Sequence, residues 1–201
     1  AGQITGRADT ANRYPHAFLY RDGLMADLGT LGGSESLGQS INESGQVAGT
    51  AYLVNGRWHA ARFSDGEVTD LGALDGAVSY GIAINIAGDV LGGYIHEDDG
   101  VSHTFRYSNG VAQDIGSLGG ISTLGTAMND AGQVTGWSSR ADGTSHAFVA
   151  SPGEPMIDLG TLGGPRSIGY AINSSGQVAG WAELPDRTQR AFLATPITKL
   201  F

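Results

Sequence analysis

Gly45-Gln46-Val47-Ala48-Gly49 follows a pattern that returns along the whole chain. The counterparts begin at Gly2, Gly88, Gly132 and Gly176, and aspartate replaces the glutamine in the copy at Gly88. Successive copies are 43, 43, 44 and 44 residues apart. A period this regular is typical of an array in which each copy is one supersecondary unit. We therefore interpret residues 1–201 as a single repeat domain, with units that start near 2, 45, 88, 132 and 176.

Four segments with strand character fill each period. The first has the pattern Ser/Thr-x-Gly-x-x-Ile/Met-Asn and occurs at 36–42, 79–85, 123–129 and 167–173. An Asn-x-x-Gly turn connects it to the second segment, which is the Gly-Gln-Val pattern. The third segment, His-Ala-Phe or a variant of it, occurs at 16–20, 59–63, 103–107, 146–150 and 190–194. The fourth ends in Asp27, Asp70, Asp114 and Asp158.

Four strands joined by hairpins and followed by a glycine-rich connection are typical of one blade of a β-propeller. The period also suits a four-stranded blade, and it is long for one coil of a β-solenoid, which is the alternative fold. We predict an all-β, five-bladed β-propeller built from four-stranded repeats of 43–44 residues.

One blade is predicted to be a strand short. The first segment occurs only four times, whereas the second and third occur five times, and Ile197–Phe201 is a candidate for the last fourth strand. The unpaired strand edge could pair with another chain, so we predict a homo-oligomer or homopolymer formed by strand complementation. The residues predicted to take part are Gly2, Gln3, Ile4, Ile197, Leu200 and Phe201. The alternative is that the missing strand belongs to residues that precede Ala1 in a longer chain.

The composition restricts the partners and the compartment. The net charge of −9 disfavours a nucleic-acid partner, because the chain would repel a phosphate backbone. No apolar run is long enough for a membrane span, and the absence of cysteine excludes disulfides and thiolate metal sites. The first residues do not have the pattern of a signal peptide, so we expect an exported protein to be present here in its processed form.

His16-Ala17-Phe18 and His146-Ala147-Phe148, together with Asp-Leu-Gly-Thr-Leu-Gly-Gly at 27–33 and 158–164, give the chain a family resemblance. It resembles the HAF repeat family of probable extracellular bacterial proteins over essentially its whole length. Ala61, Thr104 and Arg190 depart from the repeated motif. The resemblance implies an extracellular location and a repeat architecture, and it implies no activity, cofactor or site residue.

The repeated polar residues are predicted to be structural. His16, His59, His103 and His146 occupy one slot in successive repeats, so they cannot converge on one metal ion unless they line the axis. We predict instead that each histidine fixes the aspartate at the end of the fourth strand of its own repeat. Weak calcium binding at the acidic turns around 98–100 and 142–143 is the alternative. Asn42 and Asn173 match a glycosylation pattern that the turn sequence itself nearly imposes.

No catalytic constellation stands out, because the nonrepeating carboxylates lie in turn-like contexts and no nucleophile motif is present. We therefore predict no enzymatic activity and no cofactor. A five-bladed glycosidase-type enzyme remains the third alternative.

Sequence variation is concentrated between the second and third segments, where loops on a rigid scaffold often carry recognition. The candidate ligand-binding residues there are Trp58, Trp137, Trp181, Tyr52, Tyr94, Arg140 and Arg187. Tryptophan faces can stack on sugar rings, although these aromatic side chains could instead pack between blades. We predict a structural or adhesive extracellular protein, with a carbohydrate-binding, lectin-like propeller as the alternative.

Overall fold

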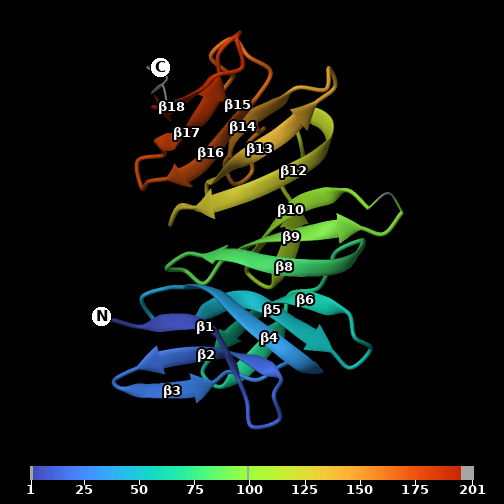
Figure 1. The fold of residues 1–201 in the computed structure, drawn as a ribbon, viewed down its shortest axis with the longest axis vertical. Coiled ribbons are helices and arrows are strands. Elements are labelled where there is room, and N and C mark those ends of the chain that lie inside the picture. Colours follow the sequence, from blue (N-terminus) through green and yellow to red (C-terminus); the bar gives the residue numbers. More distant parts are fainter. Residues whose placement is uncertain (1, 99, 196–201) are drawn as a thin grey trace. The chain divides into compact units, whose positions relative to one another are not determined.

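A computed structural model describes residues 2–98 and 100–195. Within these residues the chain is all-β, as predicted, and its eighteen strands form five antiparallel sheets (Figure 1). The chain divides into two compact units, Ala1–Asp114 and Ile115–Phe201. The single repeat domain over 1–201 stays a prediction.

The first unit contains three sheets whose strands follow the order of the sequence. The first sheet consists of β1 (Ile4–Asp9), β2 (Pro15–Arg21) and β3 (Leu24–Asp27). The second consists of β4 (Gly32–Ile41), β5 (Val47–Leu53), β6 (Trp58–Ser64) and β7 (Glu67–Asp70). The third consists of β8 (Gly76–Ile84), β9 (Val90–His96), β10 (Ser102–Ser108) and β11 (Val111–Asp114).

The second unit contains two sheets with the same strand order. The fourth sheet consists of β12 (Gly119–Met128), β13 (Val134–Arg140), β14 (Ser145–Ala150) and β15 (Ile157–Asp158). The fifth consists of β16 (Ser167–Ile172), β17 (Val178–Glu183) and β18 (Gln189–Ala194). Each sheet therefore corresponds to one repeat of the sequence.

Tight turns of the predicted type connect the third and fourth strands. Asp22 and Gly23 have φ values of 53° and 81°, and Asp65 and Gly66 have 54° and 81°. Positive φ at both central residues is the requirement of a type I′ turn, which matches the twist of a hairpin. These Asp-Gly pairs therefore form the hairpin turns between the third and fourth strands.

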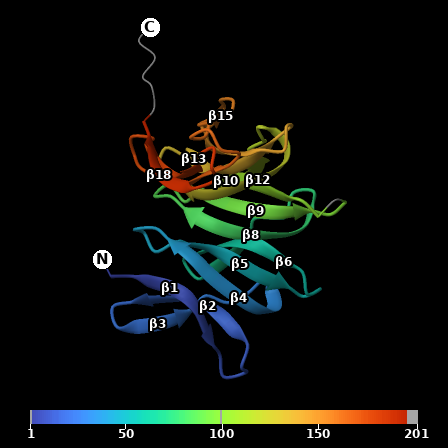
Figure 2. The ribbon, with the colours of Figure 1, turned by 45° about the horizontal axis from the view of Figure 1, so that its top comes forward.

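Successive sheets of the first unit pack through small and apolar side chains. β4 lies against β1 and β2 (Figure 2). Phe63 and Val47 of the second sheet are buried in the core. Between the second and third sheets, a Cβ atom at Gly81 would lie 2.6 Å from the backbone oxygen of Gly49. Glycine in the first strand thus allows neighbouring sheets to approach at backbone distance.

A serine in three of the first strands bonds to the preceding sheet. The backbone N–H of Ala17 donates to Ser36 Oγ at 2.8 Å, and that of Ala60 donates to Ser79 Oγ at 2.8 Å. In the second unit the N–H of Ala147 donates in the same way to Ser167 Oγ at 2.8 Å. These bonds give a structural reason for the serine that opens the repeated pattern at Ser36, Ser79 and Ser167.

The first sheet has three strands in the described part of the chain and no counterpart of the first strand of the repeat. Its strands β1, β2 and β3 are the second, third and fourth strands of the repeat. The fifth sheet also has three described strands, and the fourth strand predicted for it at Ile197–Phe201 lies outside the described residues. The five-bladed propeller with one blade a strand short stays a prediction.

Candidate functional site

The four aligned histidines each contact the aspartate predicted for them. Nδ1 of His16, His59 and His146 lies 2.9, 2.9 and 2.8 Å from a carboxylate oxygen of Asp27, Asp70 and Asp158. His103 is 3.6 Å from Asp114. The same aspartates also accept backbone N–H bonds, as Asp27 does from Gly29 at 2.8 Å. Each pair therefore fixes the fourth strand and its turn.

Tyr94 has a structural position and is not available to a ligand. Its hydroxyl donates to Asp114 at 2.6 Å, and its ring stacks on His103 with a centroid distance of 5.1 Å. Burial, followed by the hydrogen bond to Asp114, raises the pKa of the Tyr94 phenol. The structure thus places this candidate ligand-binding residue in the core.

The candidate aromatic residues lie in strands, so their assignment to loops is wrong. Tyr52 is in β5, Trp137 is in β13 and Trp181 is in β17, while Trp58 begins β6. Variation in the sequence therefore continues into these strands.

The other candidates are also held in local contacts. The Nε1–H of Trp181 donates to the hydroxyl of Tyr170 at 3.1 Å. Arg140 pairs with Asp142 at 3.0 Å and with Asp158 at 3.4 Å. Arg187, at a φ of 64°, donates its backbone N–H to Leu184 within a tight turn.

Tyr52 and Trp58 are the candidates that come together. Their ring centroids are 5.7 Å apart, and Trp58 is 36% exposed. Both line a cavity of about 250 Å³ that also contains Arg7, Glu35 and Tyr80. Arg7, Glu35 and Tyr80 were not predicted as site residues, because they lie in three different sheets and no local motif connects them.

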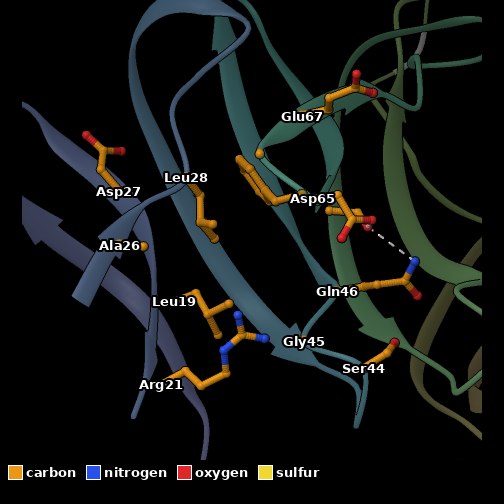
Figure 3. Close-up of a pocket in the computed structure, with 13 residues that line it drawn as sticks. Leu19, Arg21, Ala26, Asp27, Leu28, Ser44, Gly45, Gln46, Asp65 and Glu67 are labelled. Carbon is orange, nitrogen blue, oxygen red and sulfur yellow. Dashed lines mark hydrogen bonds between the residues drawn. The ribbon is translucent and has the colours of Figure 1, made fainter. Parts of the chain in front are cut away.

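A second cavity, of about 390 Å³, lies between the first and second sheets (Figure 3). Its polar lining includes Arg21, Gln46, Asp65 and Glu67. Ser64 Oγ donates to Asp65 at 2.8 Å within the turn, and the amide of Gln46 donates to Ser64 Oγ at 3.4 Å. Ser64, Asp65 and Gln46 are thus held in hydrogen bonds within the second sheet and its turn. The lining of the cavity does not suggest a catalytic arrangement.

The exposed edge of β1 differs most from its counterparts in the other sheets. Ile4 is 54% exposed, whereas Val47, Val90, Val134 and Val178 in the same slot are 0–1% exposed. In the described residues β1 pairs only with β2, while β5, β9, β13 and β17 each pair with a first strand as well. The edge that a first strand covers in each of the other four sheets is therefore open on β1.

In the described part of the chain, Gly6 in β1 also lacks the neighbouring strand that its counterparts have. At Gly49, Gly136 and Gly180 an added Cβ atom would overlap the carbonyl oxygen of the paired first strand, from Leu37, Leu124 and Ile168 respectively. At Gly6 the nearest atom is in the ring of Phe18, at 3.1 Å. The backbone of β1 thus keeps the glycine that a neighbouring strand requires.

Among the self-association residues, Gln3 and Ile4 therefore lie at this open edge, with Gly2 beside them. Ile197, Leu200 and Phe201 lie outside the described residues. Asn42, a possible glycosylation site, is buried, and its side-chain amide donates to Gln46 Oε1 and to the backbone oxygen of Asn85.

No helix in the described part of the chain is long and apolar enough to cross a membrane. Across residues 2–98 and 100–195, no three histidine, aspartate or glutamate side chains gather in a way that could hold a metal ion.

Comparison with known proteins gives information on the fold alone. No family model matches the sequence, and no curated protein matches it either. The structure is similar to TolB from Acinetobacter baumannii, with a TM-score of 0.55 and 14% identity over 96% of this chain. It is also similar to a putative TolB from Agrobacterium tumefaciens, with a TM-score of 0.56 and 13% identity over 97% of this chain.

The chain spans about half the length of the first of these proteins (51%) and 71% of the second. The all-β, multi-sheet fold is thus shared with TolB structures. Membership of the HAF repeat family stays a prediction.

Proposed function

We propose that the chain is a nonenzymatic, extracellular structural or adhesive protein of the HAF repeat type that assembles with a second copy through the open edge of β1. In this proposal the five sheets are the blades of one β-propeller. The TolB-like fold and the repeated serine and glycine contacts between successive sheets support the propeller.

The exposure of Ile4 carries the proposal for assembly. Four valines in the equivalent slot are buried beneath a paired first strand, and Ile4 is half exposed. Burying the rest of this side chain under an added strand would contribute about 1 kcal/mol, in addition to the backbone hydrogen bonds of the new pair. An exposed strand edge with an apolar residue is a surface that natural proteins ordinarily protect.

Sedimentation velocity over a wide concentration range tests the assembly. We expect the wild-type chain to associate, and Gly6→Ala to remain monomeric, because the new methyl group would occupy the position that an incoming strand needs. Leu24→Ser is the matched control, since Leu24 is 76% exposed at the start of β3, on the other edge of the same sheet. Equal association of wild type and Gly6→Ala, both folded, would contradict the proposal.

The second candidate function is carbohydrate binding at the cavity formed by Tyr52 and Trp58. An exposed tryptophan face beside Arg7 and Glu35 offers both stacking and hydrogen bonds to a sugar. Glycan-array binding that is lost in Trp58→Ala and kept in Trp137→Ala would favour this function. Arrays without binding, combined with association in sedimentation, would favour the structural role.

A further inference from the structure

The open edge of β1 contains a buried polar atom without a hydrogen-bond partner. Oε1 of Gln3 is inaccessible to solvent and no group in the described residues donates to it. It lies against the turn of the next repeat, where a Cβ atom added to Gly45 would be 3.1 Å away. Unpaired buried acceptors are uncommon in native proteins, so each one calls for a missing donor.

The other repeats identify this donor. Oε1 of Gln46, Gln133 and Gln177 accepts the side-chain amide of Asn42, Asn129 and Asn173, each at 2.8 Å. In each case the asparagine ends the first strand of the same repeat. Gln3 has the same slot and the same orientation against the next turn, and its repeat lacks the first strand.

The asparagine of each complete repeat forms one further bond, and in two of the repeats it forms a second. Its side-chain oxygen accepts the backbone N–H of the glutamine, as in the bond of 3.0 Å from Gln46 to Asn42. Its amide also donates to the backbone oxygen of the equivalent asparagine one repeat later, from Asn42 to Asn85 at 3.0 Å and from Asn129 to Asn173 at 2.9 Å. For the first repeat, the corresponding later acceptor is the oxygen of Asn42.

Space for the missing group is present beside Gln3. A cavity of about 410 Å³ is lined by Gly2, Gln3, Ile41, Asn42 and Glu43. Two of the groups that an incoming asparagine would need, Gln3 and Asn42, therefore border one cavity next to the free edge of β1.

We infer that the edge of β1 is a selective acceptor for an antiparallel strand of the Ser/Thr-x-Gly-x-x-Ile/Met-Asn type, and that the terminal asparagine is recognised by Gln3 Oε1 and the oxygen of Asn42. This inference rests on the proposed assembly and specifies what the partner strand must contain. Because β4, β8, β12 and β16 each pair within their own sheets, a second copy supplies such a strand by strand exchange, which releases it from its own sheet. The pairing of Ile41 with Val47 in the second sheet places the apolar residue of the partner opposite Ile4.

A peptide with the sequence of residues 166–174 is the direct probe, because it contains the pattern Ser167 to Asn173. Binding to the full chain is measured by fluorescence anisotropy, with an Asn173→Asp peptide for comparison. The aspartate has the same shape but cannot donate to Gln3 Oε1. We expect the asparagine peptide to bind roughly tenfold more tightly, as two lost hydrogen bonds predict.

Two variants, Gln3→Met and Gln3→Glu, distinguish the hydrogen bond between the asparagine amide and Gln3 Oε1 from the backbone pairing of the peptide with β1. Methionine removes the acceptor, so the preference for asparagine should fall to about threefold or less, while a glutamate carboxylate should preserve it. Similar affinities of the two peptides for the wild-type chain would overturn the inference and leave strand acceptance standing. Failure of both peptides to bind the wild-type chain would instead contradict the proposed function itself.

Discussion

At the scale of single residues, the repeated glutamine has two different environments in one chain. Gln46 Oε1 accepts a hydrogen bond from Asn42, whereas Gln3 Oε1 is buried without a donor. Removing the acceptor from Gln46 leaves the Asn42 amide with one partner fewer, but the same change at Gln3 removes an unsatisfied atom.

We therefore expect Gln46→Met to lower the free energy of unfolding by about 1–2 kcal/mol and Gln3→Met to leave it unchanged or to raise it slightly. Urea unfolding followed by circular dichroism measures both variants at one concentration of protein. A loss of stability in Gln3→Met as large as that in Gln46→Met would mean that Gln3 has a partner in solution.

Tyr94 predicts how stability depends on alkaline pH. Burial and the bond to Asp114 raise the pKa of this phenol above the ordinary value of 10.0. The stabilising contribution is fully present below pH 10.0 and is lost as the pH rises toward the folded pKa, because the unfolded chain loses its phenol proton first.

The Tyr94→Phe variant should be less stable than the wild type at neutral pH by about 1 kcal/mol, because a hydrogen bond is missing. The difference should shrink at pH values above 10.0, since phenylalanine has no proton to lose. Urea unfolding at neutral and alkaline pH gives both differences. A difference that stays constant with pH would show that the phenol of Tyr94 titrates normally.

At the scale of the strands, the glycine of the Gly-Gln-Val segment depends on the strand next to it. A methyl group at Gly49 would overlap the carbonyl oxygen of Leu37 in the paired first strand. Gly49 and Leu37 both lie in the paired backbones of β5 and β4. At Gly6 only the ring of Phe18 is close, and a ring can shift by a few tenths of an ångström.

We expect Gly49→Ala to destabilise the chain by about 1–3 kcal/mol or more, and Gly6→Ala by less than about 1 kcal/mol. Thermal unfolding compares the two variants, which have the same substitution in the same slot of the repeat. If Gly6→Ala were as damaging as Gly49→Ala, a strand would already cover β1 in the isolated chain.

The strands and turns could be predicted from the sequence because their signals are local. Asp65-Gly66 requires positive φ at both residues, and the pattern ending in Asn42 repeats in register. The location of Trp137 could not be predicted in this way, since a position that varies between repeats can still lie within a strand. The bond between Ser36 and Ala17 was also missed, because the two residues belong to different sheets.

The missing hydrogen-bond partner of Gln3 could be predicted from the sequence only in part. Counting segments predicted that one blade would be a strand short, and the structure shows a first sheet of three described strands. The chemical consequence required coordinates, because only the contact between Gln46 and Asn42 shows what the glutamine of each repeat normally binds.

At the scale of the whole molecule, charge opposes assembly while the strand edge favours it. Each chain has a net charge of −9, so two copies repel one another. Salt screens this repulsion over a distance of about 10 Å at 0.1 M, and backbone hydrogen bonds and buried apolar contacts are much less sensitive to salt.

We therefore expect self-association to strengthen as sodium chloride is added. Sedimentation velocity at low and high salt measures the change, and Gly6→Ala should remain monomeric under both conditions. Association that weakens with salt would indicate that ion pairs hold the copies together, and would argue against strand pairing at β1.

The asparagine bonds between repeats have a consequence for how such a chain can change in evolution. The boundary between the second and third sheets and the boundary between the fourth and fifth use the same donor and acceptor, 43 and 44 residues apart. Tandem duplication or loss of a whole period therefore recreates a boundary of the same kind. An insertion that separates an asparagine from its glutamine would instead disrupt two neighbours at once, so length variation should be tolerated mainly in the outer loops or as complete copies.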